Sequence, residues 1–282
     1  MHGVLNLYKE TGKSSNYLLT QIKKKLNIKK IGHMGTLDPL ACGVLPVMIG
    51  KGTKLFDHYL NKTKVYRAVF TFGKATATLD SEGEVVEISN NIPKFDEIKK
   101  VLPSLIENEY QIPPNFSANL INGVRAYNLA RKGESVQLKP KKIKIYHINL
   151  LKQINNNSFL FEIKCSSGTY IRSIVRDMAN LLNTVGFMSA LIRISSGEFE
   201  INKSTCLEDL TKENLSSKLI SFKQLFEKEI ILKDEDFKKI TNGVKVQTEI
   251  LAEPNILVYC QNKLIGLGEI ENHILSMKIM LI

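Results

Sequence analysis

The most informative stretch of this chain reads Gly32-His33-Met34-Gly35-Thr36-Leu37-Asp38-Pro39-Leu40-Ala41-Cys42-Gly43-Val44-Leu45-Pro46. Its glycines permit backbone conformations and close approaches that other residues resist. Pro39 restricts the preceding residue to extended geometry, which fixes the direction of the Asp38 carboxylate. An aspartate held in this way is a candidate nucleophile or base. Taken alone, it could equally be a residue that caps a turn.

The charge of the whole chain is the next observation. Among 282 residues, 39 are Lys or Arg and 28 are Asp or Glu, which gives a formal net charge of +11. Such an excess attracts polyanions, of which nucleic acid is the usual one. Lysine is common throughout, so runs such as Lys23-Lys24-Lys25 could also be solvated faces. The charge favours a nucleic-acid partner without identifying it.

Length and composition are those of a globular protein. A chain of 282 residues predicts one large domain, or one domain with a small appendage. The hydrophobic share of 43% and the charged share of 24% argue against disorder. No apolar run approaches the roughly 18 residues of a membrane span, and the first residues lack a secretory pattern. We expect a cytoplasmic chain without membrane contacts.

Several motif classes fail on spacing. The cysteines lie far apart and form no C-x-x-C pair, so they predict neither a zinc site nor a disulfide framework. Gly12-Lys13-Ser14 resembles the end of a phosphate-binding loop, but Leu7 occupies the position of the leading glycine. Ser166 lacks the glycine that a G-x-S-x-G hydrolase motif requires. We therefore expect no metal and no nucleotide cofactor.

Hydrophobic periodicity predicts short strands and amphipathic helices in alternation. The expected strands are 4–7, 65–72, 143–151, 159–165 and 191–194, and the expected helices are 14–26, 95–106, 126–132 and 171–182. A turn is expected at 80–83, whereas the glycine-rich segment 32–52 receives no regular element. Short β-like pieces at 256–259, 264–268 and 275–282 indicate a small β-rich C-terminal domain that begins near residue 229.

The segment around Asp38 closely resembles the G-H-x-G-x-L-D-P-x-A-x-G-x-L signature of the TruB family, the tRNA pseudouridine-55 synthases. The likeness continues in chain order through Lys64-Val65-Tyr66-Arg67, Gln111-Ile112-Pro113-Pro114-Asn115-Phe116-Ser117-Ala118, Gly168-Thr169-Tyr170-Ile171-Arg172 and Ala190-Leu191. Ordered matches of this kind are far more specific than any single one of them.

The resemblance implies a fold and a reaction. The expected fold is α+β, with a mixed, largely antiparallel central sheet in a catalytic domain at 1–228 and a PUA-like RNA-binding domain at 229–282, as in bacterial members. The expected reaction isomerises uridine 55 in the T-loop of tRNA. The base is flipped out of the stack, the bond from C1′ to N1 breaks, and C5 joins C1′. No cofactor or metal is required, the partner is tRNA, and we expect a monomer.

The resemblance also assigns catalytic residues. Asp38 matches the catalytic carboxylate of the family. Tyr66 matches a tyrosine that lies against the target base and is a proposed acceptor of the C5 proton. Arg172 matches the arginine that pairs with the carboxylate, which would keep Asp38 ionised and correctly directed.

Four further residues are expected to bind substrate. Tyr170 and Leu191 match residues that form the walls of the uracil pocket, and His33 matches a histidine that contacts the RNA. Lys9 aligns with a family lysine, but the family's D-K-P segment reads Tyr8-Lys9-Glu10 here. The changed segment leaves the role of Lys9 open.

Two other functions fit the same pattern. The chain could be a tRNA-folding chaperone that opens the loop without catalysis, or a pseudouridine synthase that acts on another RNA. The lack of extended basic tails argues against a ribonucleoprotein subunit. A requirement for Asp38 would separate an enzyme from a chaperone, because a chaperone does not need the carboxylate.

Overall fold

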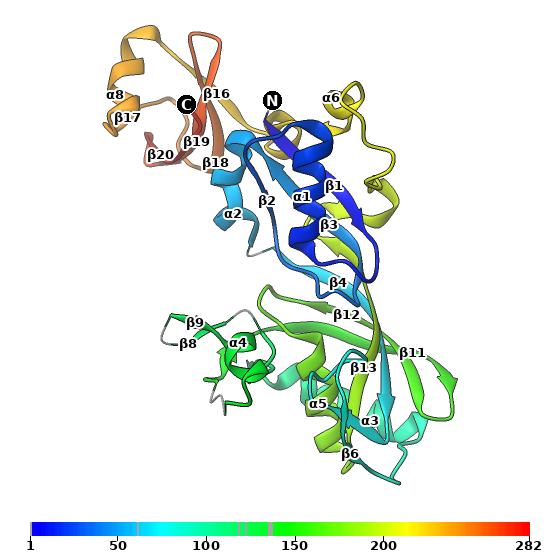
Figure 1. Cartoon of the computed structure of the whole chain (residues 1–282). Helices are drawn as coiled ribbons and strands as arrows, with labels where there is room; N and C mark the ends of the chain where they lie inside the picture. The colour runs from blue at the N-terminus through cyan, green and yellow to red at the C-terminus, as the bar shows by residue number, and fades with distance from the viewer. Residues whose placement is uncertain (1, 61, 118, 122, 135–137) are drawn as a thin grey trace.

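The computed structural model describes residues 2–60, 62–117, 119–121, 123–134 and 138–282. Ala118, which belongs to one of the motifs above, lies outside the described residues. Within the described ranges the chain forms a nine-stranded sheet, a five-stranded sheet and three two-stranded ribbons. Figure 1 shows the larger sheet running through the molecule and the smaller sheet at one corner.

The larger sheet has the strand order β11-β12-β4-β13-β3-β1-β15, and β14 and β2 pair with β13 and β3. Its strands are β1 (Gly3–Lys9), β2 (Ile31–His33), β3 (Cys42–Ile49), β4 (Lys64–Phe72), β11 (Ile145–Asn155), β12 (Ser158–Cys165), β13 (Gly186–Ser196), β14 (Phe199–Glu200) and β15 (Leu219–Ile220). Every described pair is antiparallel except β13 with β3, which is parallel. The predicted mixed, largely antiparallel sheet is therefore confirmed.

Three longer helices cover this sheet, and shorter helical turns connect the strands. α1 (Ser15–Leu26) begins where the Ser14 side chain accepts a hydrogen bond from the Tyr17 amide and caps the helix. The other long helices are α3 (Phe95–Glu107) and α5 (Ile171–Leu181). The short ones are η1 (Gly50–Leu55), α2 (Phe56–Leu60), α4 (Ala126–Arg131), η2 (Ile201–Lys203), α6 (Leu215–Lys218), α7 (Phe222–Leu225), η3 (Asp234–Asp236) and α8 (Phe237–Thr241).

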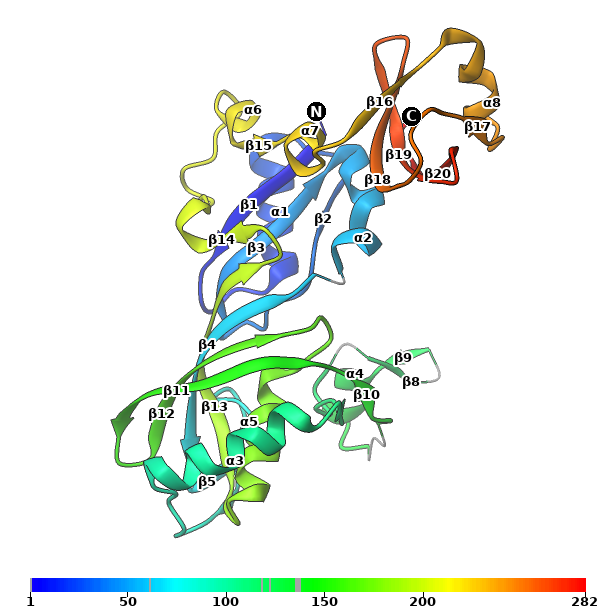
Figure 2. The same ribbon diagram turned by 180° about the vertical axis from the view of Figure 1, so that it is seen from behind.

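The larger sheet consists of two parts that meet along one short contact. β13 pairs with β4 along its length, but it reaches β3 only at Ile192–Cys42 and Arg193–Gly43. Gly43 makes this approach possible, because its φ is +105° and a Cβ there would lie 2.3 Å from the Arg193 carbonyl oxygen. Figure 1 and Figure 2 show α1 with β1, β2 and β3 on one side of this junction, and α3 and α5 with β4, β11, β12 and β13 on the other.

Three ribbons extend from the part of the sheet that carries α3 and α5. They pair β5 (Lys74–Thr76) with β6 (Val85–Ile88), β7 (Tyr110–Gln111) with β10 (Lys141–Lys142), and β8 (Leu120–Ile121) with β9 (Val124–Arg125). The predicted turn at 80–83 connects β5 to β6. It packs against β13, because the Met188 amide donates a hydrogen bond to the Leu79 carbonyl (3.0 Å).

The C-terminal segment forms the smaller sheet, in the order β16-β18-β19-β20-β17. Its strands are β16 (Glu229–Leu232), β17 (Val246–Gln247), β18 (Glu253–Cys260), β19 (Lys263–Glu271) and β20 (Ile274–Met280). Leu257 and Leu267 of this sheet pack in one apolar cluster with Val4 and Met48 of the larger sheet. Lys54 of η1 adds a hydrogen bond to the Met280 carbonyl (2.7 Å). The predicted β-rich C-terminal region is therefore present.

The sequence prediction missed strand β3. Its residues from Gly43 to Ile49 are all buried, so the polar alternation that identifies a half-exposed strand is absent. Proline is uncommon inside a sheet, but the Pro46 carbonyl accepts the Met34 amide (2.9 Å) and keeps the segment paired. The other predicted elements are confirmed, with bounds that differ by a few residues. No helix among the described residues is long and apolar enough to cross a membrane.

Candidate functional site

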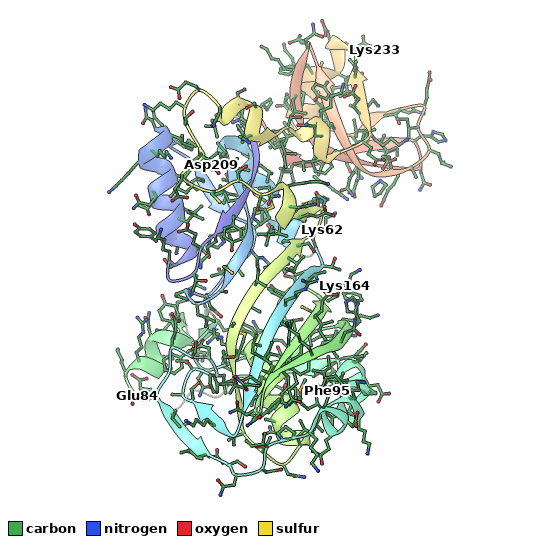
Figure 3. The ribbon with its side chains drawn as sticks, turned by 90° about the vertical axis from the view of Figure 1, so that its right-hand side faces the viewer. Lys62, Glu84, Phe95, Lys164, Asp209 and Lys233 are labelled. Atoms are coloured by element: carbon green, nitrogen blue, oxygen red, sulfur yellow. The ribbon has the colours of Figure 1, made fainter. Side chains whose placement is uncertain are left out.

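A pocket of about 330 Å³ opens where the two parts of the larger sheet meet. Its volume lies at the lower end of the range for small-molecule pockets. Four segments line it: the loop 35–38, strand β4, residues 167–172 at the start of α5, and strand β13. The lining includes five of the seven predicted site residues, namely Asp38, Tyr66, Tyr170, Arg172 and Leu191. Figure 3 labels Lys62 and Lys164, which lie near this junction.

The loop that carries Asp38 is held by Ser15 of α1. The Ser15 hydroxyl accepts a hydrogen bond from the Leu37 amide (2.9 Å) and donates one to the Leu37 carbonyl (3.0 Å). The Asp38 carbonyl accepts from the Ala41 amide (3.1 Å), which closes a tight turn around Pro39. These contacts fix the backbone next to Asp38, whose side chain keeps 34% of its surface exposed in the pocket.

Arg172 is buried and holds the Asp38 carboxylate. One terminal nitrogen lies 3.0 Å from an Asp38 oxygen, and the other lies 3.3 Å from an Asp80 oxygen. The same nitrogens donate to the Phe116 carbonyl (3.1 Å) and the Thr78 carbonyl (3.0 Å). The planar guanidinium is therefore fixed by four oxygens, a geometry that lysine cannot reproduce.

Asp80 is a site residue that the sequence prediction did not include. It is 3% exposed, and it accepts hydrogen bonds from the Thr78 hydroxyl and the Glu82 amide. Leu79 before it has a left-handed φ of 61°. The sequence signal was an acidic residue in the turn 80–83, which looked like ordinary turn chemistry. Only the fold brings that turn to Arg172.

Burial and the neighbouring charges have opposing effects on the pKa of Asp38. Burial raises the pKa of the Asp38 carboxyl above its ordinary value, and the neighbouring Arg172 opposes the rise. Asp80 adds to the rise, since two carboxylates share one guanidinium. Asp38 therefore keeps a partly exposed carboxylate whose charge depends on Arg172.

The remaining lining residues form the walls of the pocket. Tyr66 is 7% exposed and Leu191 is 8% exposed. Burial raises the pKa of the Tyr66 phenol, and the positive charge of Arg193, which lines the same pocket, opposes that rise. Gln111 fixes Tyr170, because its side chain accepts from the Tyr170 amide (2.8 Å) and donates to the Tyr170 carbonyl (3.2 Å).

His33 and Lys9 lie outside the lining of this pocket. His33 ends strand β2, and its buried Nδ1 has no hydrogen-bond partner among the described residues. Burial lowers the pKa of His33, which favours the neutral ring near pH 7. Lys9 is fully buried behind the loop, and its ammonium donates to the carbonyls of Glu10 (3.0 Å), Pro39 (3.2 Å) and Ala41 (2.6 Å). Its position is that of a residue that supports the loop and has no exposed surface for RNA.

A family model described as "TruB family pseudouridylate synthase (N terminal domain)" matches residues 23–171. The chain belongs to the TruB family. Relatives named "tRNA pseudouridine synthase B" include one from Clostridium novyi, which is 41% identical over 277 residues and covers 95% of each chain. Another, from Clostridium perfringens, is 42% identical over 250 residues, or 87% of this chain and 85% of its own.

Solved structures show the same fold at lower identity. This TruB-family chain resembles a chain of a Cbf5-Nop10-Gar1 complex with a TM-score of 0.68 and 24% identity, over 98% of this chain and 84% of that one. It also resembles a chain of an H/ACA RNP bound to a substrate RNA that contains 2′-deoxyuridine, with a TM-score of 0.67 and 23% identity, over 99% and 85%. The fold is that of the pseudouridine synthases, as the resemblance implied, and members of this family are isomerases.

Proposed function

We propose that this TruB-family chain converts uridine 55 in the T-loop of tRNA to pseudouridine, with Asp38 as the catalytic carboxylate. The observation that carries the proposal is the Asp38 carboxylate, which lies 3.0 Å from the buried Arg172 in a pocket that Tyr66 and Leu191 also line. The relatives named tRNA pseudouridine synthase B support tRNA as the substrate.

The pocket suits a flipped base. A stacked uridine hides the atoms that react, so an enzyme must extrude the nucleotide at a cost of a few kcal/mol. Leu191 and Tyr170 would enclose the uracil, and Tyr66 would lie against it. The open part of the pocket leaves Asp38 facing the ribose.

The reaction needs only rearrangement of the substrate's own atoms. The bond from C1′ to N1 breaks while Asp38 supplies negative charge at the sugar. The uracil turns, and C5 bonds to C1′. The C5 proton then leaves to Tyr66, and N1 gains a proton from solvent. No electrons are exchanged with another molecule, so the proposed chemistry requires no redox partner or metal.

We assign catalysis to residues 1–228, which carry the pocket. Residues 229–282 would bind the RNA outside the T-loop. His33 would contact the loop at the end of β2. The net charge of +11 supports a polyanionic partner. Lys9 enters this proposal as a support for the loop and has no contact with RNA.

Release of tritium from C5 tests the proposal. Wild type, Asp38→Asn and Asp209→Asn are incubated with a T-loop transcript that carries tritium at C5 of its uridines. Asp209 is an exposed acid far from the pocket (Figure 3) and serves as the matched control. We expect one tritium released per transcript by wild type and by Asp209→Asn, and none by Asp38→Asn. Tight binding without release by wild type would favour a chaperone or another RNA target.

A further inference from the structure

Arg193 is an unusual buried charge. Its side chain has no exposed surface, and no carboxylate of the described residues forms an ion pair with it. A buried cation is costly unless its N–H groups are satisfied and its charge is used. Arg172, by contrast, is neutralised by two carboxylates. Arg193 was not among the predicted site residues, so its presence in the pocket needs a separate explanation.

The position of Arg193 follows from the strand pairing. It lies on β13, directly opposite Tyr66 on β4 and opposite Gly43 on β3. Residues opposite one another on paired strands present their side chains to the same face. The side chains of Arg193 and Tyr66 therefore lie on the same face, and both line the pocket where the two parts of the larger sheet meet.

The hydrogen bonds of Arg193 direct its fork into the pocket. Its Nε donates to the Val44 carbonyl (2.7 Å), and one terminal nitrogen donates to the Gly35 carbonyl (3.1 Å). A guanidinium carries five N–H groups in one plane, so two such bonds fix the orientation of the others. Arg193 and Tyr66 line the same pocket, and the charge of the guanidinium acts to lower the pKa of the phenol.

We infer that Arg193 is a positioning residue for Tyr66, which fixes the phenol oxygen and stabilises its phenolate through an unneutralised guanidinium. The inference rests on the proposed function, in which Tyr66 accepts the C5 proton. A neutral phenol is a poor acceptor, so the phenol must first lose its own proton to solvent. The C5–H bond then breaks, the proton passes to the phenolate oxygen, and the electron pair of that bond returns to the ring.

The other groups around Tyr66 do not supply this stabilisation. Cys165 on the neighbouring strand β12 and Asp38 across the pocket both raise the pKa of Tyr66. Arg172 is held by Asp38 and Asp80. Lys64 lines the same pocket, and burial lowers its pKa to about 8. Arg193 is the group whose positive charge favours the ionised phenol.

A single fluorinated side chain tests this without any activity measurement. 3,5-Difluorotyrosine in place of Tyr66 is more acidic, so its ionisation can be followed by ¹⁹F NMR while the chain stays folded. An opposite charge nearby shifts a pKa by about 1 to 3 units, so we expect Arg193→Met to raise the labelled phenol's pKa by that amount. Arg193→Lys keeps the charge but loses the fork, and we expect a smaller rise.

Arg67→Met is the matched control. Arg67 is next to Tyr66 in sequence, but it is exposed and pairs with Glu162 (3.1 Å). Its replacement should leave the titration unchanged. An unchanged titration in folded Arg193→Met would overturn the inference. If Arg193→Met does not fold, the titration of the labelled phenol is measured in Arg193→Lys instead. An unchanged phenol pKa in that variant would overturn the role of the planar guanidinium.

The kinetic test separates positioning from mere support of the fold. In single-turnover experiments, we expect Arg193→Lys alone to lower the rate of tritium release below that of wild type. Added to Tyr66→Phe, it should cause no further loss of rate. An equal loss in both backgrounds would mean that Arg193 acts through the Gly35 loop and not through Tyr66. If wild type releases no tritium, the proposed function fails, and the ¹⁹F titration still decides whether Arg193 tunes Tyr66.

Discussion

The two sides of the Asp38 loop are each held by a buried cation, and the two cations act differently. On the pocket side, Arg172 binds the carboxylates of Asp38 and Asp80. On the other side, Lys9 binds three backbone carbonyls and no carboxylate of the described residues. Arg172 therefore controls the charge and direction of a side chain, whereas Lys9 controls the path of the backbone. The contrast indicates that burial of a cation does not by itself mark a catalytic group.

Among the residues that hold Asp38 and its loop, the largest effect is expected on the pocket side from Asp80→Asn. The change removes one of the two carboxylates that fix Arg172, so the guanidinium can shift away from Asp38. A misplacement of about 1 Å at a reacting group costs on the order of 100-fold in rate. We expect single-turnover tritium release to fall by about that factor, with an unfolding midpoint close to wild type. Glu84→Gln, an exposed acid of the same hairpin (Figure 3), should leave the rate unchanged.

Arg172→Lys should have the next largest effect. Lysine keeps the charge but cannot contact both carboxylates and both carbonyls, so we expect a loss of about tenfold or more in turnover with tRNA affinity nearly intact. Arg172 opposes the burial-driven rise in the pKa of Asp38 through its charge and through its contact with the carboxylate, and lysine loses that contact, so we expect the pKa to rise further. In the proposed mechanism activity requires ionised Asp38, so it should fall as the pH drops through this pKa. In a plot of rate against pH, the acid limb should therefore move to higher pH. Wild-type turnover with an unchanged acid limb would contradict the pairing of Arg172 with Asp38.

Lys9→Met should act mainly on stability. It removes a donor from three carbonyls, of which the Pro39 carbonyl keeps the Gly12 amide (2.8 Å), and an unsatisfied buried polar group costs about 1–3 kcal/mol. We expect a lower free energy of unfolding in urea and a rate that falls less than in the two pocket variants. Lys13→Met, which removes an exposed lysine paired with Glu10, is the control. A Lys9→Met variant that is as stable as wild type but inactive would contradict the assignment of Lys9 as a support for the backbone.

The Lys9 prediction also has a pH dependence. Burial lowers the pKa of Lys9 to about 8, below its value of about 10.4 in an unfolded chain. Between these values the unfolded chain binds more protons than the native chain, so this group adds stability as the pH rises. The difference in free energy of unfolding between wild type and Lys9→Met should widen from pH 7 to pH 9.5. A constant difference would mean that the native pKa of Lys9 does not lie in this pH range.

The sequence predicted much of the site through ordered motifs. Asp38, Tyr66 and Arg172 come from segments far apart in the chain, yet all three line one pocket. Their roles in catalysis remain predictions that the variants above test. Local patterns also predicted α1, α5 and most strands, because amphipathic periodicity and caps are properties of neighbouring residues.

What the sequence alone determined is the family motif, the periodic elements and the Asp38 loop, since each depends on residues close together in the chain. The tertiary structure decided the rest. Strand β3 has no alternation because neighbours bury both of its faces. Asp80 and Arg193 became site residues only when a turn and a strand met Arg172 and Tyr66 across long sequence separations. Buried charges depend on such contacts, because their energies are set by the partners and the solvent exclusion that folding supplies.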